Sequence, residues 1–411
     1  MLGLRIRLLF QHRLTRVTML LLAVAFLALL PTELASTIEI STQIDGRLPI
    51  FEASAAGLSG KIAEEWVLSP FEGIGLISGI ARCDDEVFLV DVHESVVHRF
   101  ILSTGRSVGH VGPLDTGGST LRYPTAIAAD CAGGHLYVVD ITGVLVFDLA
   151  TGELKRRFPK PPGFVVSTGV SPVFDSRTSS LYVSGLWTPM PQPKWLSRNL
   201  YGMFERDHLG YRLDLLTGDT SQLFPSIERN CWTFSSHCLS VALDRVNDQT
   251  DLAWLAAQGL SLRIGLFHAS YKMIGTIDVR SPMFLRDGRR LLNRAPLARQ
   301  MALQETNSVI RQVYSLGDVI AVVHSSNRTR NWRKGLPMDF EVFMNLYSAD
   351  GSGLVSDIRL PNLPVGHDAS NVYVLDYGPN GRRHAGSLPL TLMRLDIADL
   401  RSPNSWQGSG R

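Results

Sequence analysis

Four polar side chains end short apolar segments of this chain, and their types could support acid–base or metal chemistry. Asp91 ends VFLVD, Asp140 ends LYVVD, Asp376 ends NVYVLD and His324 ends VIAVVH. Carboxylate oxygens are the ligands that Ca²⁺ prefers, and a carboxylate beside an imidazole can act as acid and base. An Asp at a strand end also caps the following turn by accepting from its backbone N–H groups. A divalent cation such as calcium and a structural turn cap are therefore both open interpretations.

Two tryptophans flank a proline-rich segment, WTPMPQPKW, which runs from Trp187 to Trp195. Its prolines favour an extended, stiff backbone, and each indole offers a large flat surface to a sugar ring or a partner protein. The segment therefore predicts a binding loop. The alternative is a lid whose tryptophans pack inward.

A second segment, NRTRNWRK at 327–334, surrounds one indole with cations: Arg328, Arg330, Trp332 and Arg333. Guanidinium groups clasp carboxylates and phosphates through two parallel hydrogen bonds, so this segment is a candidate anion-binding loop. A solvated surface loop is the alternative.

The composition limits what can position these residues. The chain has 411 residues with 45% hydrophobic content, which is enough for an extensive core, and its 36 glycines and 21 prolines lie mostly between short apolar runs. This pattern favours an all-β fold. The formal net charge is only +2, so no global electrostatic drive toward nucleic acid or anionic lipid is expected.

A repeated unit is the strongest feature of the sequence. Ile80–Arg106 and Ile127–Glu153 share a strand such as LYVVD and a Thr-Gly hairpin, as in FILSTG and FDLATG. A third copy has LYVSG and LDLLTG, and weaker copies follow over 239–279, 309–360 and 363–397. The unit of about 50 residues matches a four-stranded propeller blade.

The copies predict an all-β, six-bladed β-propeller of four-stranded blades. The last copy ends before a fourth strand, while an additional strand, Lys61–Leu68, precedes the first copy. We expect this N-terminal strand to complete the last blade and close the ring, which removes two unpaired sheet edges.

The N-terminal 36 residues differ in composition from the remainder. Four arginines precede the apolar run Val17–Leu30, which as a helix would span about 21 Å, short of the ~30 Å hydrocarbon core. Residues 1–36 are therefore expected to be a signal peptide or an N-terminal membrane anchor, with the cleaved signal favoured. The remainder would be exported, either periplasmic, secreted or tethered facing outward. We expect a linker at 37–59, the propeller at 60–400 and a tail at 401–411.

Four cysteines in an exported chain permit two disulfides. Cys231 and Cys238 lie in one segment and are candidates for one such bridge. Cys83 and Cys131 occupy equivalent places in adjacent blades. A bridge requires Cα atoms within about 7 Å, and neighbouring blades diverge from the axis, so we expect these two to remain separate thiols.

The long segments fall on one side of such a ring. Propeller strands run a to d from the axis outward, so b–c and d–a connections leave on one face and a–b and c–d connections on the other. Long segments at b–c or d–a positions are Trp187–Asp207, Ser281–Thr306, Ser325–Asp339 and Gly378–Ser387. Long loops on a rigid scaffold commonly carry binding, so we expect this insertion face to be the functional one.

The repeats, with their LYVVD-like second strand and Thr-Gly hairpin, resemble the NHL and TolB-like class of six-bladed propellers. In shape this class includes the gluconolactonase-like and regucalcin-like lactonases. The resemblance covers roughly residues 60–400 and implies the fold. Lactonase-like members hold a divalent metal in the channel with Glu, Asn and Asp, and no such set falls on matching strand ends here.

Two functions follow from these expectations. The favoured one is an exported binding propeller whose insertion face binds a small polar ligand, a glycan or a protein, with no nucleic acid partner and with membrane contact only through the N-terminal segment. The alternative is a metal-dependent hydrolase of the sugar-lactonase type acting in the central channel.

Overall fold

The computed structural model describes most of the chain after residue 61. The described residues are 62–69, 74–111, 121–187, 208–227, 241–246, 253–259, 263–281, 284, 308–326, 341–376 and 390–401. The expected signal or anchor at 1–36 and the expected linker at 37–59 lie outside them. No helix within these residues has the length and apolar character needed to cross a membrane.

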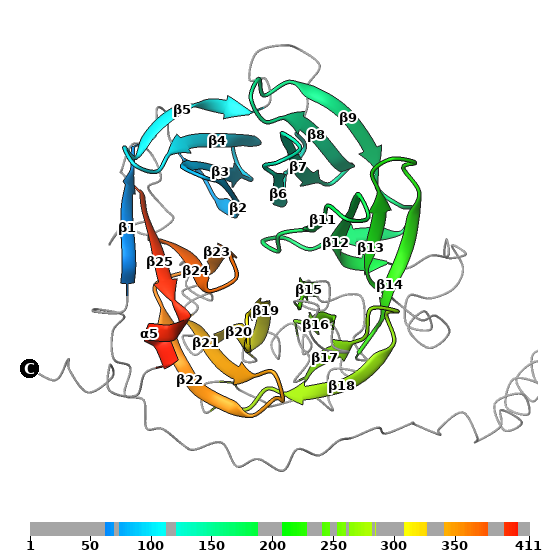
Figure 1. Cartoon of the computed structure of the whole chain (residues 1–411), viewed down its shortest axis with the longest axis vertical. Helices are drawn as coiled ribbons and strands as arrows, with labels where there is room; N and C mark the ends of the chain where they lie inside the picture. Colours follow the sequence, from blue (N-terminus) through cyan, green and yellow to red (C-terminus); the bar gives the residue numbers. More distant parts are fainter. Residues whose placement is uncertain are drawn as a thin grey trace, which may run out of the picture. The chain divides into compact units, whose positions relative to one another are not determined.

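Six antiparallel sheets surround a common centre as the blades of a propeller (Figure 1). From the innermost strand outward, blade 1 contains β2 (Ile77–Cys83), β3 (Glu86–Asp91), β4 (Val96–Ile101) and β5 (Arg106–Val111). Blade 2 contains β6 (Ala126–Asp130), β7 (His135–Asp140), β8 (Gly143–Asp148) and β9 (Leu154–Pro159). In blade 3 the innermost strand is split into β10 (Phe164–Val166) and β11 (Val173–Asp175), followed by β12 (Ser180–Trp187), β13 (His208–Asp214) and β14 (Thr220–Pro225).

The other three blades repeat this order. Blade 4 contains β15 (Val241–Arg245), β16 (Trp254–Gln258), β17 (Arg263–Phe267) and β18 (Met273–Asp278). Blade 5 contains β19 (Val309–Leu316), β20 (Val319–Ser326), β21 (Glu341–Ser348) and β22 (Gly353–Leu360). Blade 6 contains β23 (Pro364–His367), β24 (Asn371–Asp376), β25 (Leu390–Asp396) and, as its outer strand, β1 (Ile62–Leu68). A short helix, α5 (Ile397–Arg401), follows β25.

The ring is closed by its N-terminal strand, as predicted. β1 pairs antiparallel with β25, with Trp66 opposite Leu392 and Leu68 opposite Leu390. Leu68 is fully buried in the apolar cluster between blades 6 and 1. The six-bladed all-β fold is therefore confirmed.

Both faces of each blade are apolar because each packs against a neighbour. In β3, Val87 and Leu89 belong to the cluster shared with blade 6, whereas Phe88 and Val90 belong to the cluster shared with blade 2. This two-sided burial explains why the sequence shows continuous apolar runs instead of polar alternation.

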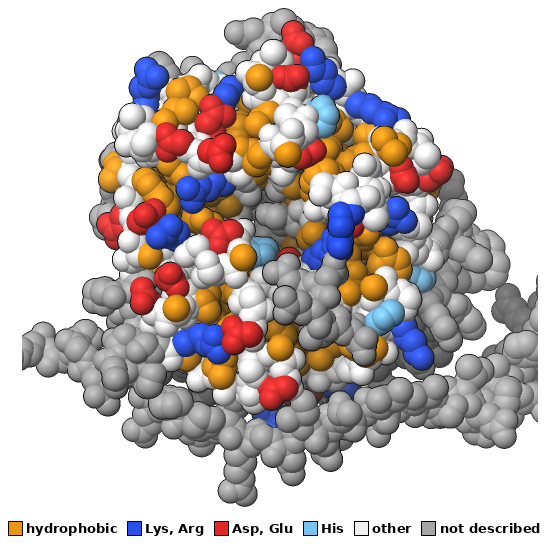
Figure 2. Space-filling view, viewed as in Figure 1, with side chains coloured by type: hydrophobic (Ala, Val, Ile, Leu, Met, Phe, Trp, Pro, Cys, Tyr) orange, Lys and Arg blue, Asp and Glu red, His pale blue; other side chains and the backbone are white. Residues whose placement is uncertain are grey.

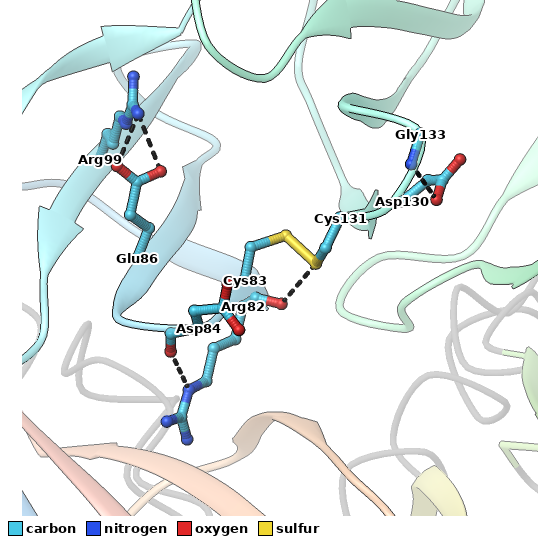
Figure 3. Close-up of a disulfide and its surroundings, with 8 residues drawn as sticks. All are labelled: Arg82, Cys83, Asp84, Glu86, Arg99, Asp130, Cys131 and Gly133. Carbon is cyan, nitrogen blue, oxygen red and sulfur yellow. Dashed lines mark hydrogen bonds and ion pairs between the residues drawn. A yellow bond between two sulfur atoms is a disulfide. The ribbon is translucent and has the colours of Figure 1, made fainter.

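The prediction for Cys83 and Cys131 was wrong, since these residues form a disulfide (Figure 3). Their Cα atoms lie 5.5 Å apart, and they join the end of β2 in blade 1 to the turn after β6 in blade 2. Blades do diverge from the axis, but their innermost strands lie closest to it, where adjacent blades are nearest. Cys231 and Cys238 lie outside the described residues.

The long connections all leave on the insertion face. Between the described strands, no connection on the opposite face, here called the turn face, exceeds the eight residues 246–253 between β15 and β16. On the insertion face, six connections are longer: 112–125, 188–207, 226–240, 279–308, 327–340 and 377–389. This asymmetry is the one expected from the sequence.

Candidate functional site

Asp91, the first strand-end carboxylate, is fully buried and caps a turn. Its oxygens accept hydrogen bonds from the backbone N–H groups of Gly75 at 2.5 Å, His93 at 2.9 Å and Glu94 at 3.1 Å. His98 Nε2 lies 3.3 Å from Oδ2. Burial by itself raises the pKa of this carboxyl, but the hydrogen bonds outweigh burial and the pKa is lowered. Asp91 is thus an ionised structural cap.

Asp140 plays the same role in blade 2 and is also fully buried. Its Oδ2 accepts from the backbone N–H of Arg122 at 2.9 Å. Its Oδ1 accepts from the backbone N–H and the hydroxyl of Thr142, both at 2.6 Å, and from the N–H of Gly143 at 3.0 Å. Both carboxylates therefore accept hydrogen bonds from nearby backbone N–H groups.

His324 is buried between the rings of Phe284 and Phe343, with ring centroids 5.1 and 5.6 Å away. Burial lowers its pKa to about 3, so the imidazole is neutral at physiological pH. Asp376, half-buried, ends β24 of blade 6. Across the described part of the chain, no group of three or more His, Cys, Asp or Glu side chains is arranged to hold a metal ion. These four side chains are therefore not brought together as a metal centre.

Trp187 ends β12 and packs on its own blade. Its Nε1 donates to the carbonyl oxygen of Pro162 at 3.1 Å, and its ring lies edge-on to Tyr211 with centroids 6.3 Å apart. The remaining residues of the two expected binding loops lie outside the described residues: Trp195, Arg328, Arg330, Trp332 and Arg333. Binding by these loops stays a prediction.

Residues 167–170, here called the plug, lie between β10 and β11 and contact several blades. In Figure 1 the chain next to β11 turns toward the middle of the ring. Ser167 Oγ accepts from the N–H of Val241 in blade 4 at 2.8 Å. The N–H of Gly169 donates to the carbonyl oxygen of Thr125, just before blade 2, at 3.1 Å. The plug therefore ties blade 3 to its neighbours on both sides.

Gln312 on β19 fixes the plug from blade 5. Its Nε2 donates to the carbonyl oxygens of Gly169 and of Pro364 in blade 6, both at 2.7 Å. Gly169 has a φ of +78°, and a Cβ there would lie 3.6 Å from the carbonyl oxygen of Ser78 in blade 1. A positive φ favours glycine, so the plug needs this residue type at the point where the blades meet.

A polar cluster lies at the other end of the channel, where three innermost strands end on the turn face. We call Asp244 on β15, Tyr314 and Ser315 on β19, and His367 on β23 the mouth cluster. Asp244 Oδ2 accepts from the Ser315 N–H at 2.5 Å and lies 3.1 Å from His367 Nε2. Its Oδ1 accepts from the N–H of Arg245 at 2.8 Å. One carboxylate thus joins blades 4, 5 and 6.

The charge of Asp244 governs the protonation of its neighbours. Burial lowers the pKa of His367, but the charge and hydrogen bond of Asp244, together with the charge of Asp368, outweigh burial and the pKa is raised. The Tyr314 ring packs on the His367 ring with centroids 4.4 Å apart. Burial and the Asp244 charge raise the pKa of Tyr314 well above its usual value. The cluster therefore favours an imidazolium beside a neutral phenol.

Sequence reasoning missed the mouth cluster because its members come from the three weakest repeats and from the face with short connections. The available signal was positional: Asp244, Ser315 and His367 each stand at or next to the end of an innermost strand. Parallel innermost strands bring their ends together at one mouth of the channel. In Figure 2 histidine and acidic side chains are visible near the middle of the ring.

No family model matches the sequence, and no curated protein matches it. Among solved structures, a member of the DUF4221 family from Bacteroides vulgatus is 11% identical, with a TM-score of 0.56 over 81% of this chain and 96% of the other. A Bacteroides fragilis protein that is named as exported is 12% identical, with a TM-score of 0.53 over 81% of this chain and 95% of the other. The likeness is one of fold.

A calcium-binding protein from Agrobacterium tumefaciens, regucalcin, is also similar at 12% identity, with coverage of 80% of this chain and 94% of the other. Its TM-score of 0.42 is too low to support an argument about function. The six antiparallel sheets of the ring confirm the expected six-bladed propeller architecture, and the similarity to these solved structures extends to the fold alone.

Proposed function

We propose that this chain is an exported propeller that binds a small polar ligand, a glycan or a protein through its insertion face. The observation that carries the proposal is the asymmetry of the ring, since all six connections longer than eight residues leave on one face. A closed, two-sided core holds the ends of these connections in fixed positions, which suits loops that recognise a partner.

Two features support export. The N-terminal sequence has arginines followed by the apolar run Val17–Leu30, as signal peptides do. The Cys83–Cys131 disulfide is the second feature, because such bonds form and persist in oxidising compartments. The two features are physically independent of each other.

A hydrolase acting in the channel is the weaker proposal. The oxygens of Asp91 and Asp140 are engaged by backbone N–H groups, so a metal ion would have to displace those hydrogen bonds. The plug is also hydrogen-bonded to blades 4 and 5 and turns toward the middle of the ring, where such chemistry would take place (Figure 1). Binding without bond cleavage needs neither free carboxylates nor an open channel.

The chemistry of the partner follows from local residues. The net charge is +2, and Figure 2 shows cationic and anionic side chains interspersed, which gives no extended attraction to a polyanion. Trp195 offers an aromatic surface for a sugar ring, and Arg328, Arg330 and Arg333 are suited to carboxylates. Glycans that carry acidic sugars combine both features.

The test is a panel of immobilised neutral and acidic glycans probed with the full-length chain. One variant replaces 188–207 by a short Gly-Asn-Gly turn, and a second carries Trp195→Ala with Arg330→Ala. The matched control shortens 247–252 on the turn face. We expect at least a tenfold loss of binding in the first two variants and none in the control. Retained binding by both variants would contradict the proposal.

A further inference from the structure

The mouth cluster on the turn face contains hydrogen-bonding capacity that the fold does not use. Tyr314 is 6% exposed, and its hydroxyl has no hydrogen-bond partner among the described residues. Nδ1 of His367 makes no hydrogen bond to any described residue either, and 22% of this side chain is exposed. The two side chains are neighbours, with ring centroids 4.4 Å apart.

Asp244 fixes the orientation of His367. Oδ1 accepts from the backbone N–H of Arg245 and Oδ2 from that of Ser315, and Oδ2 also lies 3.1 Å from Nε2, so the carboxylate is held in place. Nε2 therefore carries its hydrogen toward Asp244. In the neutral imidazole Nδ1 is then an acceptor, whereas in the imidazolium Nδ1 is a donor.

The Tyr314 hydroxyl makes no hydrogen bond to the described residues that would stabilise the fold. A Phe would supply the same ring against His367 and the core between blades 5 and 6, without burying an unsatisfied hydroxyl. Since burial and the Asp244 charge raise the pKa of this phenol, it remains a neutral donor. A buried donor beside a partly exposed imidazolium is suited to an acceptor oxygen that enters from solvent.

Nearby acidic groups do not compete for these donors. The carboxylate of Asp368 accepts from the Tyr373 hydroxyl at 2.6 Å and from Asn371, and Asp175 pairs with Arg245 at 2.9 Å. The charge of Asp244 is balanced by His367 itself. An added monoanion would therefore face two donors and no unpaired carboxylate among these neighbours.

We propose that the mouth cluster binds the carboxylate group of a small organic acid, with the His367 imidazolium and the Tyr314 hydroxyl as donors. Asp244, Ser315 and His367 stand at or next to the turn-face ends of their strands, so we expect the ligand to enter from the turn face. This site is separate from the insertion face and does not depend on the function proposed for that face.

The competing explanation is a purely structural clamp, because the Asp244–His367 pair also joins blades 4 and 6. A clamp needs the Asp244–His367 contact but not the Tyr314 hydroxyl. Tyr314→Phe therefore separates the two explanations, since it keeps the ring and removes only the donor.

The experiment titrates sodium acetate into the full-length chain and follows the ring resonances of His367 and Tyr314 by NMR. We expect a saturable shift in the wild type, about tenfold weaker binding in Tyr314→Phe and loss of binding in His367→Gln. Tyr347→Phe is the matched control, since that buried tyrosine of blade 5 already bonds the N–H of Arg280. We expect it to bind acetate as the wild type does.

The pH dependence supplies a second readout. Binding requires the imidazolium, which faces Asp244 from β15, Tyr314 from β19 and Asp368 from its own turn. Acetate affinity should fall about tenfold per pH unit above the pKa of His367, whereas a neutral alcohol that donates to Nδ1 would show the reverse. The absence of a saturable shift, equal affinity in Tyr314→Phe, or affinity independent of pH would each overturn the proposal.

Discussion

The backbone N–H of Ser69 donates to the carbonyl oxygen of Gly105 at 2.8 Å. Ser69 directly follows β1, and Gly105 lies in the hairpin between β4 and β5 of blade 1. The strand that completes blade 6 thus continues onto blade 1, so closure rests on a contact with the next blade as well as on pairing with β25. A Cβ on Gly105 would lie 2.0 Å from the carbonyl oxygen of Val67.

Gly105→Ala is therefore expected to destabilise the closed ring. The φ of +64° disfavours any side chain, and the contact with Val67 adds a clash, so we expect a loss of about 2–4 kcal/mol in the free energy of unfolding. Gly134→Ala is the matched control, with a φ of +70° and nothing within 4 Å of the added Cβ. It should cost only about 1–2 kcal/mol in urea unfolding. Equal losses in the two variants would show that the contact with β1 adds nothing.

Reduction of the Cys83–Cys131 disulfide should also weaken the ring. The bond joins residues with a sequence separation of 48. A disulfide that closes a loop of this size stabilises the folded state by about 2–4 kcal/mol. We expect urea unfolding of the wild type to shift to lower concentration on reduction. The double variant Cys83→Ser with Cys131→Ser should unfold at the same urea concentration as the reduced wild type. Addition of reductant should not lower that concentration further. A wild type insensitive to reductant would contradict the bond's contribution.

The plug should depend on Gln312. Gln312→Leu leaves the carbonyl oxygens of Gly169 and Pro364 without their donor, which is expected to cost about 2–4 kcal/mol. Gln222→Leu, on the outer strand β14, should change stability by less than about 0.5 kcal/mol. Chemical denaturation of both variants measures the difference. A Gln312→Leu chain as stable as Gln222→Leu would mean that the plug is held by other contacts.

His324 should make the chain acid-sensitive. Its pKa is about 3 in the folded chain and near 6.5 when unfolded, so the unfolded state binds more protons between these values. Stability should therefore fall, by several kcal/mol, as the pH drops from about 6.5 toward about 3. His324→Leu removes this contribution, and its unfolding free energy should depend less on pH in that window.

His367 acts in the opposite direction. Its raised pKa contributes stability that is fully present below the unfolded pKa of about 6.5 and is lost as pH rises through the folded value. His367→Gln should therefore alter the pH dependence of the unfolding free energy above about pH 6.5. The dependence below about pH 6.5 should stay as in the wild type. A change above about pH 6.5 in His324→Leu, or below about pH 6.5 in His367→Gln, would contradict these two assignments.

The blades could be predicted because each is a local repeat. The VFLVD and LYVVD strands and the Thr-Gly hairpins recur with regular spacing. The closing strand could be predicted because the last repeat lacks a fourth strand and an additional strand precedes the first repeat. Asp91 and Asp140 could be interpreted as turn caps for the same reason, since the backbone that they bind lies within a few residues or in the connection that precedes the blade.

The features near the axis could not be predicted, because they depend on how closely the innermost strands converge. The divergence of the blades predicts separate thiols for Cys83 and Cys131, although the ends of β2 and β6 lie close enough for a disulfide. The plug arises from a break in one innermost strand, and Gln312 reaches it from more than a hundred residues away in sequence. The Asp244–His367 pair likewise joins distant repeats, so no local sequence pattern predicts it.

The binding role of the insertion face is tested most directly by hydrogen–deuterium exchange on the full-length chain with and without a glycan retained from the panel. We predict that protection gained on binding lies in the connections at 112–125, 188–207, 226–240, 279–308, 327–340 and 377–389. Protection confined to the turn-face connections, such as 246–253 and 368–370, would contradict the account.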